Sequence, residues 1–64
     1  MIGYVAKDKN NEVYIHSELP EYNDTYGGWF SQPDTLNITG EFPEFDSMSY
    51  TDEPIKVEIK LEKV

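Results

Sequence analysis

The sequence contains no cysteine and no arginine, and each absence removes a class of site. Without thiols the chain has no disulfide and no thiolate metal centre, which fits a reducing compartment. Without arginine it lacks the side chain that binds phosphate through two parallel hydrogen bonds. No apolar run approaches the roughly 18 residues of a membrane-spanning helix. We therefore expect no membrane segment.

Basic residues are also missing from the whole middle of the chain. Between Asn10 and Ile55 the sequence has ten acids and no lysine, and the net charge is -8. A nucleic-acid-binding protein needs basic side chains to neutralise phosphates, so we expect no direct nucleic-acid binding. The five lysines lie near the two ends of the chain, at Lys7, Lys9, Lys56, Lys60 and Lys63.

Motifs for catalysis are missing as well. The only histidine, His16, precedes Ser17, but adjacent residues of a strand point to opposite faces and do not meet. There is no glycine-rich phosphate loop and no nucleophile elbow. Residues 8–12 look like the start of a calcium loop but lack its glycine and its distant glutamate. We expect no enzyme activity, no cofactor and no metal site.

The chain has 64 residues, so we expect a single domain over residues 1–64. A domain of this size buries only about 60% of the surface that its unfolded chain exposes. Ordering costs roughly 1.5 kcal/mol per residue, which nearly cancels the gain from burial. We therefore expect a homo-oligomer. The first residues, 1–6, lack the basic and long apolar regions of a signal peptide, and this predicts a location in the host cell cytoplasm.

The clearest pattern is the last stretch, in which apolar and charged residues alternate over 55–62. Similar patterns predict strands over 2–6 and 12–17, joined as a hairpin. We expect the hairpin to pair with the last strand, giving a mainly β fold with a small antiparallel sheet. The predicted core consists of Val13, Ile15, Trp29, Ile55, Val57, Ile59 and Leu61.

The middle of the chain is aromatic and irregular in composition. Residues 21–28 have the composition of a loop, and Trp29 then begins a short strand or serves as a buried anchor. A further strand is plausible over 35–39, and Pro43 favours at most one short helical turn. We expect this middle segment to pack across one face of the sheet. Its detailed structure over 40–54 is left open.

Short motifs in order along the chain resemble those of a known family. They are Gly3 to Ala6, Val13 to Pro20, Gly28-Trp29, Phe42 to Phe45, and Asp52 to Leu61. The chain resembles very small acidic proteins of unknown function from gut bacteria, their phages and mobile elements. That family often has Lys-Pro-Val-Arg where this chain reads Leu-Pro-Glu-Tyr, at 19–22, so the basic residues are absent here. The resemblance implies a viral or accessory protein, and such proteins often inhibit host systems.

The acidic stretch has several possible roles. It can keep an aromatic-rich chain soluble, or it can bind a host protein with a basic surface, including by nucleic-acid mimicry against a defence protein. Different alternatives are an oligomeric sponge that sequesters a nucleotide signal, and a structural protein that self-assembles through strand edges. The predicted partner-binding residues are Tyr22, Asp24, Tyr26, Glu41, Glu44, Asp46, Tyr50, Asp52 and Glu53.

Overall fold

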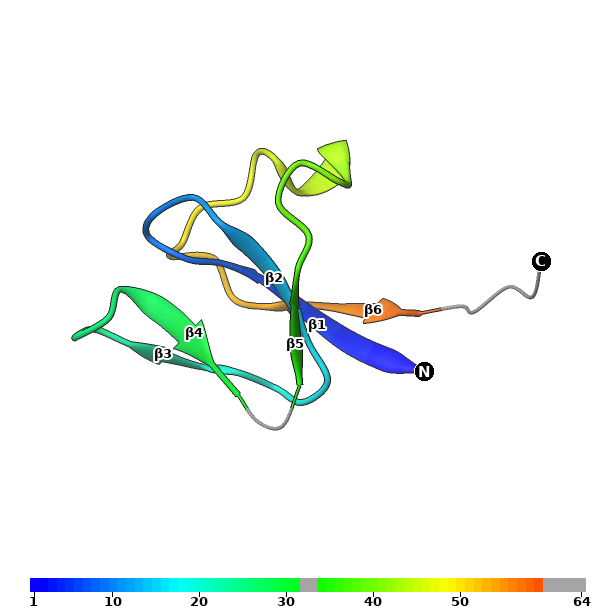
Figure 1. Cartoon of the computed structure of the whole chain (residues 1–64), viewed down its shortest axis with the longest axis horizontal. Helices are drawn as coiled ribbons and strands as arrows, with labels where there is room; N and C mark the ends of the chain where they lie inside the picture. Colours follow the sequence, from blue (N-terminus) through cyan, green and yellow to red (C-terminus); the bar gives the residue numbers. More distant parts are fainter. Residues whose placement is uncertain (32–33, 60–64) are drawn as a thin grey trace.

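The computed structural model describes residues 1–31 and 34–59 (Figure 1). In this part of the chain the fold is mainly β, as predicted, with two antiparallel sheets and one short 3₁₀ turn. The elements are β1 (Ile2–Lys7), β2 (Val13–His16), β3 (Glu21–Asn23), β4 (Gly28–Phe30), β5 (Thr35–Asn37), η1 (Pro43–Phe45) and β6 (Ile55–Glu58).

A four-stranded sheet with the order β5-β2-β1-β6 forms the centre of the molecule. The prediction that the hairpin pairs with the last strand is confirmed, because β1 pairs with β2 on one side and with β6 on the other. The sheet is therefore organised around β1 and not around the last strand. The predicted strand over 55–62 ends at Glu58 in the structure, and residues 60–62 lie outside the described part.

Each hairpin closes through a turn that suits its residues. The β1–β2 turn is held by a 2.8 Å hydrogen bond from the Asp8 amide to the Glu12 carbonyl. Asn11 has φ 72°, a left-handed conformation that asparagine tolerates better than most residues. In the second hairpin the same role falls to Gly27, with φ 68°, whose amide donates to the Asn23 carbonyl. The expected hairpin turn over 8–12 is thus present.

One face of the four-stranded sheet, here called the apolar face, carries Leu36, Ile15, Val5 and Ile55 in register across its four strands, and Val57 lies two residues further along β6 on the same face. The segment 38–48, which includes η1, covers part of it. Val5 and Val13 form the buried core with residues of that covering segment, of which Ile38 and Met48 are themselves buried. The expected single helical turn after Pro43 is confirmed as η1.

The opposite face is covered by the β3–β4 ribbon, so the aromatic middle divides between the two faces (Figure 1). The prediction that it packs across one face is therefore wrong. The loop expected at 21–28 is confined to a turn over residues 24–27. Glu21–Asn23 is a strand because it pairs with β4, and this pairing sets Tyr22 opposite Trp29. Their rings lie 5.4 Å apart in a T-shaped arrangement, a favourable aromatic geometry.

The predicted core is only partly correct. Val13 is buried, and Ile15 and Val57 are partly buried against the core. Ile55 is 40% exposed, because β6 lies at the edge of the sheet and only one of its neighbours is a strand. Trp29 and Ile59 are half-buried, and Leu61 lies outside the described residues.

The predicted core omitted the buried residues Val5, Ile38 and Met48, and also Ala6 and Lys7 on β1. Ala6 has no exposed surface, because β1 is covered on both faces. Lys7 is also buried, and its ammonium donates a 2.8 Å hydrogen bond to the carbonyl of Asp46. This charge-assisted bond ties the segment after η1 to the end of β1.

Candidate functional site

The predicted partner-binding residues fall into two groups in space. One group surrounds the β3–β4 ribbon and the segment 50–53 that packs beside it, and contains Tyr22, Asp24, Tyr26, Tyr50, Asp52 and Glu53. The other group lies on the segment that covers the apolar face and contains Glu41, Glu44 and Asp46. The carboxylates of both groups are exposed.

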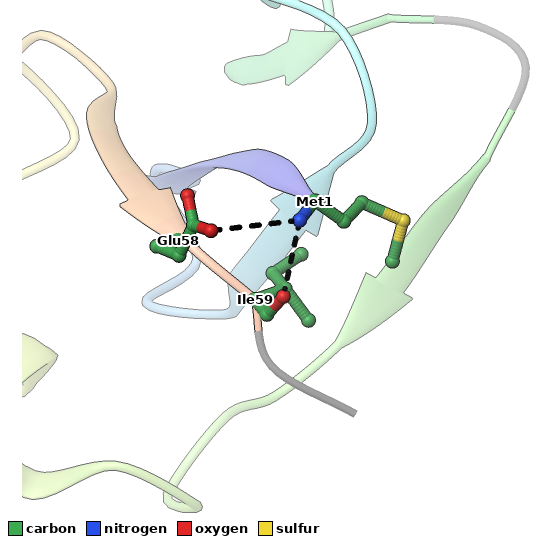
Figure 2. A network of polar contacts seen from close by, with 3 residues as sticks. All are labelled: Met1, Glu58 and Ile59. Carbon is green, nitrogen blue, oxygen red and sulfur yellow. Dashed lines mark hydrogen bonds and ion pairs between the residues drawn. The ribbon is translucent and has the colours of Figure 1, made fainter. Parts of the chain in front are cut away.

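The exposed carboxylates have almost no basic partners. Among residues 1–31 and 34–59 the structure contains one ion pair, between the amino group of Met1 and Glu58, at 3.8 Å (Figure 2). Both groups of that pair are more than half exposed, so it adds little to stability. The acidic charge therefore remains available to an external partner.

An aromatic cluster organises the first group. Tyr22 stacks on Tyr50 at 6.2 Å, and the indole nitrogen of Trp29 donates a 3.2 Å hydrogen bond to the Tyr50 carbonyl. The Lys9 ammonium lies 5.9 Å from the centre of the Tyr50 ring, within reach of a cation–π contact. Burial, reinforced by the negative charge of Asp24, raises the pKa of the Tyr22 hydroxyl. The cluster thus anchors the β3–β4 ribbon to Tyr50, and the Tyr22 hydroxyl is its polar group.

Asp8 fixes the ribbon against the β1–β2 turn. Its carboxylate accepts a 2.9 Å hydrogen bond from the Trp29 amide, and the Lys9 amide donates at 2.7 Å to the Gly27 carbonyl. A side chain at Gly28 would meet the Asp8 carboxyl carbon at 2.9 Å and would force that carboxylate to shift away from the ribbon. Sequence reasoning assigned no role to Asp8.

The remaining predicted residues have differing surroundings. Tyr26 is 76% exposed and packs edge-on against Phe30 at 5.0 Å, away from the Tyr22 stack. The Asp52 carboxylate accepts a 2.8 Å hydrogen bond from the Ser49 amide and so closes its own turn. Asp52 is therefore partly structural, whereas Tyr26 is a free aromatic surface.

A cleft of about 440 Å³ opens between the ribbon and the four-stranded sheet. Its walls include Tyr14, His16, Trp29 and Ser31. His16 is buried, and its Nδ1 lies 2.8 Å from the Ser31 hydroxyl, whereas its Nε2 is buried with no partner among the described residues. Burial lowers the pKa of His16, opposed by the negative charge of Asp8, so the ring is neutral near pH 7.

This pair differs from the arrangement used for nucleophilic catalysis. There, a histidine nitrogen activates the serine while an acid holds the other nitrogen. Here no carboxylate of the described residues bonds to the Nε2 of His16. His16 is buried, and its serine partner is Ser31 and not the adjacent Ser17, whose side chain was expected to point to the opposite face. Within the described residues, no three His, Asp or Glu side chains converge on a possible metal position.

A larger groove of about 640 Å³ lies on the apolar face. Its lining includes Ile15 and Val57 from the sheet, Phe42 from the covering segment, and the acidic residues Glu44 and Glu58. Leu36, which also lines the groove, is 64% exposed. Sequence reasoning missed this groove, because the alternating apolar residues of 55–61 were assigned entirely to a closed core.

The chain matches no protein-family model, no curated protein and no solved structure. Among the described residues, no helix has the length and apolar character needed to cross a membrane.

Proposed function

We propose that this chain is a small non-enzymatic binding protein that occupies a basic surface of a host protein and inhibits it. The observation that supports the proposal is an apolar groove whose charged side chains, among the described lining residues, are both acidic: Glu44, and Glu58, which pairs with the amino group of Met1. A matching partner presents apolar side chains flanked by lysine or arginine. The resemblance to small phage and mobile-element proteins suggests a defence protein in the host cytoplasm as the target.

Electrostatics give this mode of binding its character. Exposed acids that have no lysine partner within residues 1–31 and 34–59 produce a negative field that accelerates encounter with a basic surface. The groove then supplies apolar contact area, including the exposed side chains of Phe42 and Leu36. The association rate of such a complex falls as salt is added, because the Debye length falls from about 8 Å at 0.15 M to about 3 Å at 1 M.

The test compares two variants that remove the same charge at different places. One carries Glu41→Gln, Glu44→Gln and Asp46→Asn beside the groove, and its control carries Glu18→Gln, Glu21→Gln and Asp34→Asn elsewhere. Each is immobilised and used to capture proteins from host lysate, with circular dichroism as the check on folding.

We expect the groove variant to capture at least tenfold less of the specific partner, and the control to retain most of it. Purified partner should show an association rate that falls as salt rises. Equal loss in both variants, or an association rate that ignores salt, would assign the acids to solubility alone.

The cleft beside His16 favours a second candidate, a sponge for a small aromatic molecule such as a nucleotide. Tyr14 and Trp29 offer faces on which a base can stack. Against a phosphorylated ligand, the only charged residue that lines the cleft among those described is the acid Asp8. Mass spectrometry of molecules released by heat from the purified protein distinguishes the two, since a released nucleotide without a protein partner supports the sponge.

A further inference from the structure

The outer edge of β6 carries no strand in the described part of the chain. β6 is the last strand of the order β5-β2-β1-β6, and four residues, Ile55–Glu58, are in regular strand conformation. An edge strand presents a row of backbone donors and acceptors that can pair with another strand. The directions in which the backbone groups of β6 point determine which strand can pair with it.

The inner edge of β6 fixes which backbone groups face outward. The Ile59 amide donates to the Met1 carbonyl at 2.6 Å. The Met1 amino group donates to the Ile59 carbonyl at 3.3 Å (Figure 2). In an antiparallel ladder, hydrogen-bonded pairs alternate with non-hydrogen-bonded pairs. Val57, two residues earlier and opposite Gly3, therefore also bonds inward. The amides and carbonyls of Lys56 and Glu58 consequently point outward.

The side chains of these same two residues carry opposite charges, and this selects one register for self-pairing. With the two-fold axis at Val57, Lys56 of one chain lies opposite Glu58 of its copy, and Glu58 lies opposite Lys56. Shifting the axis to Lys56 would place like charges face to face, and so would shifting it to Glu58. Opposite charges across strands stabilise a sheet, and like charges destabilise it.

We propose that β6 pairs antiparallel with β6 of a second copy of this chain, centred on Val57, to form a continuous eight-stranded sheet across a homodimer. The outward groups of Lys56 and Glu58 then exchange hydrogen bonds in both directions. Pro54, which has no amide hydrogen, ends the ladder on one side.

The apolar face supports the same register. Ile55 is 40% exposed at the edge, and in the proposed dimer it lies opposite Ile59 of the second copy. Val57 lies opposite itself, and the two apolar grooves, each lined by Val57 and Ile59, become neighbours. The other sheet edge, β5, offers three residues, Thr35–Asn37, and no charged pair. Of these two sheet edges, β6 is therefore the one that offers a second copy both apolar contacts and opposite charges.

The first experiment uses charge reversal and sedimentation at physiological ionic strength, where the repulsion from the net charge of -8 per chain is screened. We expect wild type to approach twice the 7.4 kDa mass of one chain as its concentration rises into the micromolar range. Lys56→Glu or Glu58→Lys alone should weaken the dimer about tenfold, because each places like charges opposite each other twice. Mixing the two variants should restore association as a heterodimer.

A matched control is Glu53→Lys, which changes an exposed acid outside β6 and should leave the dimer intact. Wild type that stays at 7.4 kDa up to millimolar concentration overturns the proposal. So does a mixture of the two reversed variants that associates no better than either alone.

The second experiment uses the absence of cysteine from the natural sequence. Val57→Cys places two thiols opposite each other in a non-hydrogen-bonded pair, where Cα atoms lie about 4.5 Å apart, within the range of a disulfide. We expect oxidation to give a covalent dimer in high yield. Lys56→Cys is the control: its two copies are offset along the ladder beyond the roughly 7 Å limit for a disulfide. Equal cross-linking of both variants, or none at Val57→Cys in protein that circular dichroism shows to be folded, contradicts this register.

Discussion

Gly3 lies where the apolar face has no room for a side chain, and Gly3→Ala tests that packing. A methyl group there would meet Ile59 Cδ1 at 2.7 Å and Ile15 Cδ1 at 3.1 Å. Carbon atoms pack best at about 3.5–4.0 Å, so both isoleucines must move. Overpacking costs about 1–3 kcal/mol, and the loss of glycine's freedom in the unfolded chain returns about 0.4–1 kcal/mol.

We therefore expect Gly3→Ala to lower the free energy of unfolding by about 1–2 kcal/mol, measured by urea denaturation at one fixed protein concentration. This corresponds to a fall in Tm of roughly 4–8 °C per kcal/mol. Ile59→Val removes the Cδ1 atom that makes the closest contact. The double variant should thus recover at least about 0.5 kcal/mol relative to the sum of the single changes.

A matched control is Gly40→Ala, since Gly40 has φ 77° and no atom within 4 Å of the added methyl. Its cost is backbone strain, and Ile59→Val should not relieve it. Stability of Gly3→Ala equal to wild type, or strict additivity with Ile59→Val, would refute the packing described for this face.

Three other predictions concern buried groups. Met48→Ala should cost about 2–5 kcal/mol in urea denaturation because Met48 closes the core, and a loss below about 1 kcal/mol would place it outside. Asp8→Ala leaves the Trp29 amide unpaired and should cost about 1–3 kcal/mol, whereas a cost equal to that of the exposed Asp34→Ala would contradict its anchoring role. Because burial lowers the pKa of His16, the unfolded chain binds a proton that the fold does not as pH falls through about 6.5. Wild type should therefore lose more stability than His16→Gln between about pH 7.5 and about pH 5.5, by at most about 1.4 kcal/mol per pH unit, and equal losses would contradict the shift.

The strands that sequence patterns predicted well are those with clear alternation. β1, β2 and β6 each contain several alternating residues, and pairing then places their apolar side chains on one face. β3 was missed because three residues, Glu21–Asn23, are too few to show a period, and their pairing with β4 decides their conformation. Tertiary contact overrides composition in such short strands.

The core and the candidate site were less predictable for a related reason. Met48 stands alone among polar residues, and only the path of the covering segment brings it over Val5 and Val13. The burial of Lys7 depends on a backbone carbonyl, that of Asp46, which no side-chain pattern can indicate. The acidic character of the surface could be predicted from composition, whereas its separation into two groups follows from the division of the middle segment between the two sheet faces.

The contact between Met1 and Ile59 has a mechanical consequence. Because β1 and β6 are antiparallel and this contact lies at one end of their ladder, a force that pulls residues 1 and 59 apart loads one hydrogen-bonded pair at a time. The ladder should open like a zipper, at a lower force than strands sheared along their length would require. An unfolding machine that pulls from the β6 end would detach β6 first, and would expose the apolar face and the edge of β1 before β2 is disturbed.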